Sequence, residues 1–178
     1  MRAVLVVTLA VLMSAGASQA QVGGLIWEEQ FADLDNWIVV TGNGYWGWGN
    51  GELQFYSADN VDIAEIPGEP GNTALRIAAR AETGPGIVDQ WGNPLNYTSG
   101  RLYSKSKVSI RYGMIEARVR VPDLDLGGWP AFWLLGADFG TVGWPACGEI
   151  GIVEYRGQIP SVVTGALHGP GYSGGGSL

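Results

Sequence analysis

The stretch from residue 115 to residue 121 is the sequence feature that most limits how this chain can fold. Every second side chain in it is apolar, and Glu or Arg residues stand between them. Successive side chains of a β-strand point to opposite faces, so this period of two predicts a strand with one buried face. Tyr112-Gly113 has the composition of a turn, and Lys107–Arg111 precedes it. We therefore expect Lys107–Arg111 to pair with the alternating strand as a hairpin.

The rest of the chain repeats this pattern of short strands separated by turns. Helical periodicity is nearly absent, and clusters of Gly, Pro and Asn divide the apolar runs. Further strands are expected at residues 53–56, 75–80, 130–135, 149–155 and 161–168. Many short strands with turn signals predict an all-β sandwich or jelly roll. The intervening segment Gly84–Asn96 is long enough to border a cleft.

The first twenty residues have the composition of a secretory signal peptide. An Arg follows Met1, and the apolar run Ala3–Met13 is too short to span a bilayer. Ser18 and Ala20 are the small residues expected before a cleavage site. We predict cleavage after Ala20, which leaves one domain over residues 21–178 in a secreted protein, extracellular or periplasmic. An uncleaved membrane anchor is the alternative.

Charge and cysteine content exclude several classes of function. The net charge is −7, so nothing in the composition favours binding to nucleic acid or to an anionic membrane. A neutral substrate fits better. Cys147 is the only cysteine, which excludes an internal disulfide, and no His or Cys stands near it at metal-ligand spacing. We expect a monomer without a cofactor.

Tryptophan is abundant, and all eight copies follow the predicted cleavage site. In an acidic exported protein this abundance favours sugar rings stacked on indole faces. The alternative is a role in the core, which we expect for Trp27 and Trp37.

Two glutamates, Glu149 and Glu154, stand in an apolar, strand-like segment. Burial of a carboxylate costs free energy, so a function or a partner is expected for each. In a regular strand they would point to opposite faces, but one β-bulge near Ile152-Val153 would return Glu154 to the face of Glu149. Their α-carbons would then lie roughly 13 Å apart. Side chains leaning together could bring the carboxyl groups to the ~5–5.5 Å of glycosidases that retain configuration. One exposed and one ion-paired glutamate is the alternative.

Several longer motifs occur in an order that resembles laminarinase-like enzymes of glycoside hydrolase family 16. They are Trp48-Gly-Asn-Gly-Glu-Leu-Gln54, Tyr97-Thr-Ser-Gly-Arg-Leu102, Tyr112-Gly-Met-Ile-Glu-Ala-Arg118, Gly128-Trp-Pro-Ala-Phe-Trp-Leu-Leu-Gly136, Gly143-Trp-Pro-Ala-Cys-Gly-Glu-Ile150 and His168-Gly-Pro-Gly-Tyr-Ser173. The resemblance covers nearly all of the chain after the predicted signal peptide. It implies a concanavalin-like jelly roll of two curved antiparallel sheets, with a polysaccharide in the concave face.

The resemblance also implies an activity, which is retaining endo-hydrolysis of β-1,3-glucosidic bonds in laminarin-like β-glucans. Glu149 takes the place of the nucleophile and Glu154 that of the acid/base. The bulged spacing before Glu154 favours the laminarinase side of the family. Alternatives are a β-glucan-binding pseudoenzyme, or a transglycosylase or hydrolase of the same family that acts on another polysaccharide.

Other family positions are carried over one at a time as implied substrate-binding residues. They are Trp129, Trp133, Trp144, Arg101, Asn50, Glu52 and His168. A core role is the alternative for Trp129 and Trp133, a surface ion pair for Arg101, and a buried imidazole for His168. The resemblance places a His near the acid/base and Trp144 beside the nucleophile strand. Some members bind structural calcium, but the late segment that supplies a ligand is missing here, so we expect no metal site.

The sequence departs from the family in two ways. Gly151 stands where the family has Asp, between the two glutamates. An Asp there can hold a proton and balance the charges of the pair, so we expect its absence to lower activity on the order of 10²-fold. Family domains are also longer, and we expect this jelly roll to be truncated at its C-terminal side, with exposed strand edges and an open core.

Overall fold

The computed structural model describes residues 7–12, 23–82, 86–123 and 127–174. The chain forms two compact units, residues 1–120 and residues 121–178. Nearly all regular structure in the described residues is β-strand, which confirms the expected all-β class. None of their helices has the length and apolar character needed to cross a membrane.

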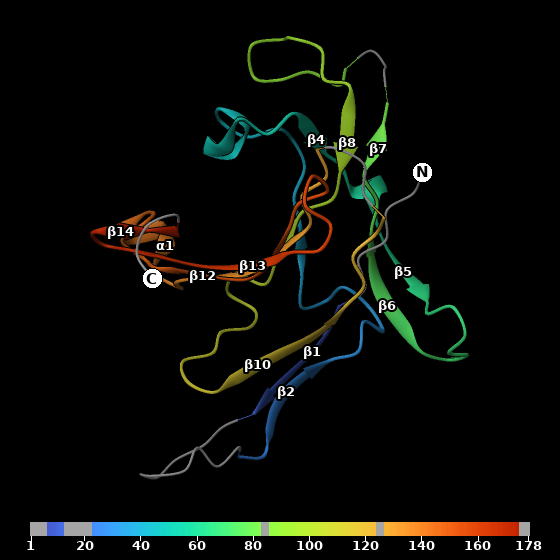
Figure 1. The fold of residues 1–178 in the computed structure, drawn as a ribbon, viewed down its shortest axis with the longest axis vertical. Helices are drawn as coiled ribbons and strands as arrows, with labels where there is room; N and C mark the ends of the chain where they lie inside the picture. The colour runs from blue at the N-terminus through green and yellow to red at the C-terminus, as the bar shows by residue number, and fades with distance from the viewer. Residues whose placement is uncertain (1–6, 13–22, 83–85, 124–126, 175–178) are drawn as a thin grey trace. The chain divides into compact units, whose positions relative to one another are not determined.

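In the first unit, a three-stranded antiparallel sheet has the order β10-β1-β2 (Figure 1). It consists of β10 (Met114–Val119), β1 (Val7–Leu12) and β2 (Leu25–Glu29). Exposed and half-buried residues alternate along β10, as the period of two predicts. Of the predicted signal peptide, residues 1–6 and 13–20 lie outside the described residues. The described part, Val7–Leu12, is strand β1 and hydrogen-bonds to β10 and β2.

Smaller sheets complete this unit. β3 (Ile38–Val39) pairs with β9 (Leu102–Tyr103), and β5 (Val61–Glu65) pairs with β6 (Thr73–Ile77). β8 (Tyr97–Ser99) lies between β4 (Gln54–Tyr56) and β7 (Arg80–Ala81), parallel to the first and antiparallel to the second. Two short irregular turns, η1 (Gly47–Gly51) and η2 (Ala58–Asn60), flank β4.

The core of the first unit surrounds Phe31 and Leu75. Trp37 stacks on Phe31 with ring centroids 5.7 Å apart, which confirms the core role expected for it. The buried Glu29 carboxylate accepts hydrogen bonds from the Phe31 amide at 2.8 Å and the Trp37 indole at 3.1 Å. These hydrogen bonds offset the cost of burying the carboxylate.

Two expectations about strands are wrong. Lys107–Arg111 forms no strand, because the amides of Lys107 and Val108 both donate to the Ser104 carbonyl in a turn, and β10 pairs with β1 instead. The run from residue 75 to residue 80 is interrupted at Ala78. There the Asn60 side chain binds the Ala78 carbonyl at 2.7 Å, and the Asn60 carbonyl accepts from the Ala78 amide at 2.8 Å. The Asn60 side chain, in place of the backbone of a paired strand, therefore satisfies the Ala78 carbonyl.

The second unit is built on a four-stranded antiparallel sheet with the order β11-β12-β13-β14 (Figure 1). The strands are β11 (Ala131–Leu135), β12 (Glu149–Tyr155), β13 (Val163–Gly169) and β14 (Tyr172–Ser173). A single helical turn, α1 (Phe139–Val142), connects β11 to β12. β12 begins at Glu149 and contains Glu154, so this sheet carries the carboxylate pair.

Candidate active site

A β-bulge interrupts β12 between the two glutamates. Gly151 pairs with Ala166 of β13, and the next paired residue, Glu154, faces Thr164. Two residues of β12, Ile152 and Val153, therefore oppose one residue of β13. The register to β11 shifts at the same place. This is the bulge that the spacing of the glutamates requires, and it returns Glu154 to the face of Glu149.

The position of the Glu154 carboxyl group supports the shared face. A β-carbon added to Gly151 would lie 2.9 Å from Glu154 Oε1 and 3.3 Å from the Ala166 β-carbon. Gly151 is two residues from Glu149 and shares its side of the strand. The end of the Glu154 side chain thus lies over the space that a side chain at position 151 would enter.

Two side chains hold Glu149. The Trp144 indole N–H donates a hydrogen bond of 2.8 Å to Glu149 Oε2. His168 is the residue directly opposite Glu149 on β13, and its Nε2 lies 4.0 Å from Glu149 Oε1. The Trp144 and His168 rings are in contact, with centroids 5.6 Å apart. The Glu149 side chain, which is 19% exposed, is therefore held by a hydrogen bond at one carboxylate oxygen and has the imidazole ring near the other.

The pairing of β12 with β13 sets the position of His168. It faces Glu149, the residue in the nucleophile position, whereas Glu154 faces Thr164. The antiparallel register decides this, because away from the bulge each residue of β13 lies opposite one residue of β12. The other ring nitrogen, Nδ1, lies 3.1 Å from the hydroxyl of Ser173 on β14. Sequence reasoning missed Ser173, and only its place in the last shared motif pointed to it.

The remaining tryptophans of this unit are exposed near the pair. Trp133 on β11 pairs with Gly151 across the strands and is 36% exposed. Trp129 is 56% exposed, and the Arg156 guanidinium lies 5.6 Å from its ring centroid. Neither is in the hydrophobic core, which disfavours the core alternative for both.

The other predicted substrate-binding residues form a cluster in the first unit. The Glu52 carboxylate accepts hydrogen bonds from Tyr56 Oη at 2.6 Å, Gln54 Nε2 at 2.9 Å and Asn50 Nδ2 at 3.1 Å. An Arg101 nitrogen lies 3.7 Å from Glu52, and both side chains are mostly buried. The ion pair of Arg101 is therefore part of a network rather than a solvated surface contact.

Aromatic rings complete this cluster. The Arg101 guanidinium lies 4.5 Å from the centroid of the Trp48 ring and 5.7 Å from that of Tyr56. Burial, and then the hydrogen bond to Glu52, raises the pKa of Tyr56 to about 12. Trp48 and Tyr56 were not among the predicted site residues, although both stand within or beside the motif that contains Asn50 and Glu52.

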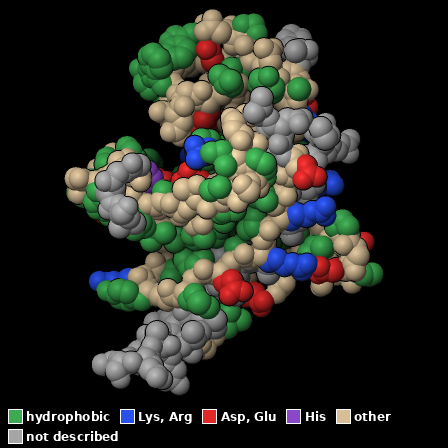
Figure 2. Space-filling model, viewed as in Figure 1, with side chains coloured by type: hydrophobic (Ala, Val, Ile, Leu, Met, Phe, Trp, Pro, Cys, Tyr) green, Lys and Arg blue, Asp and Glu red, His purple; other side chains and the backbone are tan. Residues whose placement is uncertain are grey.

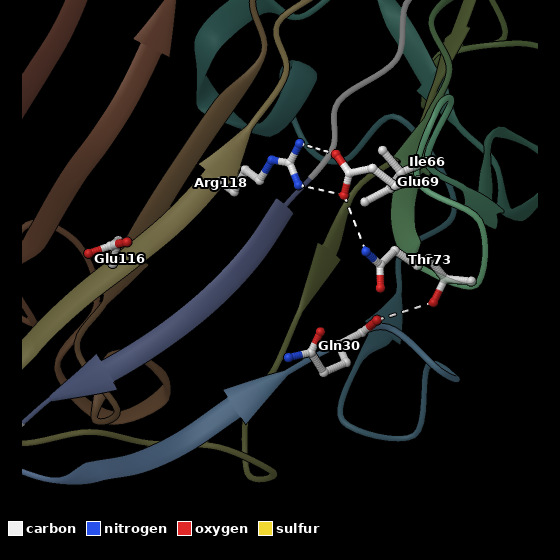
Figure 3. Close-up of a pocket in the computed structure, with 7 residues that line it drawn as sticks. Gln30, Ile66, Glu69, Thr73, Glu116 and Arg118 are labelled. Carbon is white, nitrogen blue, oxygen red and sulfur yellow. Dashed lines mark hydrogen bonds and ion pairs between the residues drawn. The ribbon is translucent and has the colours of Figure 1, made fainter.

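A pocket of 190 Å³ in the first unit is of another kind (Figure 3). Its lining is polar apart from Ile66 and consists of Gln30, Ile66, Glu69, Asn72, Thr73, Glu116 and Arg118. Figure 3 shows the Arg118–Glu69 ion pair across it, with Glu116 turned away from that pair. Because its central charges already satisfy one another, we assign the pocket no catalytic role.

No metal-binding group emerges from the described residues. Across residues 7–12, 23–82, 86–123 and 127–174, no three or more His, Cys, Asp or Glu side chains gather at a spacing that would hold an ion.

Comparison with known proteins decides the family. The model for "Glycosyl hydrolases family 16" matches residues 48–177. The chain belongs to glycosyl hydrolases family 16. As a family 16 chain it is 34% identical over 156 residues to glucan endo-1,3-beta-glucosidase A1 of Niallia circulans, covering 81% of this chain and 22% of that protein. It is 36% identical over 156 residues to the beta-glucanase of Rhodothermus marinus, covering 84% and 49%.

A solved structure confirms the fold. The laminarinase catalytic domain of Thermotoga maritima matches with a TM-score of 0.68 and 38% identity, over 87% of this chain and 60% of that one. This likeness confirms the jelly-roll fold class expected for the family 16 chain. The chain spans about half or less of the length of the two relatives named above.

Proposed function

We propose that this family 16 chain hydrolyses internal β-1,3-glucosidic bonds of a neutral, laminarin-like β-glucan with retention of configuration. The observation that carries the proposal is the β12 bulge, which places Glu149 and Glu154 on one face of a strand. Two carboxyl groups so arranged can serve as nucleophile and acid/base in a double displacement. The names of the relatives in Niallia circulans and Rhodothermus marinus support the glucan substrate.

The surroundings of each glutamate suit different roles. Glu149 accepts the Trp144 hydrogen bond at Oε2, which orients the carboxylate and leaves Oε1 for attack on the anomeric carbon. Glu154 has its Oε1 over the open space at Gly151, where the carboxyl group can move as it donates and then recovers a proton. Exposed Trp129 and Trp133 offer faces on which sugar rings can stack.

The test replaces each glutamate separately and measures reducing-sugar release from laminarin. We expect Glu149→Gln and Glu154→Gln each to lower the rate by about 10³-fold or more. Glu116→Gln, on the exposed face of β10, is the matched control and should leave the rate unchanged. Added azide then separates the roles, because it should rescue Glu149→Ala to an α-glycosyl azide and Glu154→Ala to a β-glycosyl azide. Equal rates in all variants would refute the assignment.

A glucan-binding protein without turnover is the second candidate, and Gly151 favours it. The family resemblance implies an Asp at this position, and no carboxyl group is available there to balance the charges of the pair. Laminarin binding without any release of reducing sugar would support this candidate over the hydrolase.

We also propose that the chain is exported by cleavage after Ala20 and acts as a secreted monomer. The apolar run followed by small residues supports export. Sequencing the N-terminus of protein recovered outside the producing cells should give Gln21 first. Light scattering should give the mass of one chain.

A further inference from the structure

Three aromatic side chains of the first unit form a cluster on its surface. Trp46 and Trp91 have ring centroids 5.1 Å apart and cross nearly at right angles. Tyr45 contacts both, at 6.4 Å from Trp46 and 6.5 Å from Trp91. All three are largely exposed, Tyr45 at 74%, Trp46 at 59% and Trp91 at 56%. Figure 2 shows hydrophobic side chains exposed over η1 and the loop before β8. Contiguous apolar surface of this kind marks a binding site more often than single exposed residues do.

The segment from Tyr45 to Trp48, which leads into η1, turns its aromatic side chains in two directions. Trp48 packs inward, on Gly44 and against Tyr56 and Arg101. Tyr45 and Trp46 point outward, although the backbone of the same loop is tied down by bonds from the Gly49 and Gly51 amides to their carbonyls. Trp46 holds a left-handed conformation with a φ of 53°, which is costly for a bulky residue. Tyr45 and Trp46 are therefore exposed from a loop whose backbone is held by hydrogen bonds.

The third ring stands at the tip of a small hairpin. Val88 bridges to Pro94, and the Leu95 amide donates to the Ile87 carbonyl at 2.8 Å. Asp89 closes the tip by accepting bonds of 2.8 Å from the amides of Trp91 and Asn93. The Asn93 side-chain bond and these amides hold the pKa of Asp89 below its usual range. Trp91 is thus positioned against Trp46 by a closed turn.

Charge around the cluster indicates the chemistry of its ligand. In residues 41–51 and 86–96 the only charged side chain is Asp89, and its carboxylate is occupied within the turn. These two segments supply no cation for a sulfated or uronic acid polymer. It offers indole and phenol faces, with amide side chains from Asn50 and Gln90 in the same loops. Rings of this type stack on the C–H faces of neutral pyranose units.

We propose that Tyr45, Trp46 and Trp91 form a stacking platform that binds a neutral β-glucan chain on the unit that does not carry Glu149 and Glu154. The proposal rests on the proposed function for the identity of the polysaccharide. The platform holds polymer by its ring faces, and no bond is made or broken there. It gives the protein a second point of attachment to a long or insoluble glucan, and two linked points raise the overall affinity.

Depletion isotherms on insoluble β-1,3-glucan test the platform. The measurement uses Glu149→Gln as the parent, so that binding is read without hydrolysis. Trp46→Ala/Trp91→Ala should weaken binding about tenfold or more, and Trp46→Phe/Trp91→Phe should restore most of it. The matched control is Tyr112→Ala, which removes a single tyrosine that is 69% exposed and outside the platform. It should bind like the parent.

A second measurement needs no substitution in the platform. In the parent protein, N-bromosuccinimide oxidises exposed tryptophans, and peptide mass spectrometry locates them. Glucan should protect Trp46 and Trp91. Three outcomes would each overturn the platform. The first is oxidation of Trp46 and Trp91 that glucan does not reduce, and the second is binding that the alanine pair leaves unchanged. The third is a dimer in light scattering that the alanine pair abolishes.

The platform and the proposed function fail separately. An unaltered chain that releases no sugar, together with loss of binding in the alanine pair, would refute hydrolysis and support the platform. Hydrolysis by the unaltered chain, together with undiminished binding in the alanine pair, would support hydrolysis and refute the platform.

Discussion

At the scale of single residues, the site depends on how one carboxylate is held. Glu149 has an indole donor on one oxygen and an imidazole near the other. Trp144 and His168 come from opposite sides of β12 in the sequence, yet their rings touch. In the double displacement that we propose, a nucleophile oriented in this way needs less reorganisation when it attacks, which is how positioning accelerates a reaction.

Removing the indole donor should expose its contribution. Trp144→Phe keeps an aromatic ring but loses the hydrogen bond to Glu149 Oε2. Hydrogen bonds to charged groups contribute about 1.5–3 kcal/mol, so kcat should fall about tenfold to a hundredfold. KM should change little if the bond acts only on the carboxylate. Kinetics on laminarin measure both, and a rise in KM with an unchanged kcat would instead make Trp144 a substrate-binding residue.

A substitution at Gly151 tests the site in the opposite way, because it adds a chemical group instead of removing one. Gly151→Asp supplies the carboxyl group that the family resemblance implies, and we expect laminarin hydrolysis to rise on the order of 10²-fold. The new β-carbon would lie 2.9 Å from Glu154 Oε1, so this mobile carboxyl group must move aside. Gly151→Ala has the same steric effect without the charge and should not raise the rate. An unchanged rate in Gly151→Asp would refute the hypothesis that the missing carboxyl group at position 151 lowers activity.

At the scale of elements, a buried network joins η1 to β4. Glu52 follows η1, and Tyr56 ends β4 with its hydroxyl bonded to the Glu52 carboxylate. Arg101, just after β8, lies against both side chains and over Trp48. The segment from η1 to β4 is therefore fastened to Arg101, which is distant in the sequence, by one carboxylate, one phenol and one guanidinium.

This network predicts a loss of stability in alkali. Tyr56 has a pKa of about 12 in the folded chain and 10.0 when unperturbed, so above pH 10 the unfolded chain loses this proton first. The free energy of unfolding should fall by roughly 2–3 kcal/mol as the pH rises from 10 to 12. Denaturant titrations of the protein and of Tyr56→Phe measure it. The variant should show a shallower fall, and parallel curves would contradict the role of Tyr56.

At the scale of the whole molecule, the hydrophobic core is thin. Phe31 is the only large side chain among the described residues that is fully buried. Large apolar side chains such as Leu53 and Val163 are more than half exposed. Strand β1, which lies within the predicted signal peptide, joins β2 to β10 by backbone hydrogen bonds.

The chain that begins at Gln21 should therefore be less stable than the full chain. Without β1, the edges of β2 and β10 that it pairs with lose their hydrogen-bonding partner. We expect circular dichroism to show a lower melting temperature and a broader transition for residues 21–178 than for residues 1–178. A sharp transition at the same temperature would show that β2 and β10 are satisfied without β1.

The features that the sequence predicted correctly are local. Alternation predicted β10, and apolar runs predicted β11, β12 and β13 to within about two residues. The five-residue spacing of Glu149 and Glu154 required a bulge, and the bulge is there. These features follow from the side-chain period of a strand, which each segment carries in its own sequence.

Only the tertiary structure decided which segments meet. Pairing with β1 in place of Lys107–Arg111, and Asn60 binding Ala78, depend on residues far away in the chain. The same holds for His168, which faces Glu149 because of the register between β12 and β13. A period of two tells which face of a strand is buried, but it does not tell which strand lies alongside or in what register. The glutamates could therefore be recognised from the sequence alone, whereas the groups that hold Glu149 became visible only when the strands were paired.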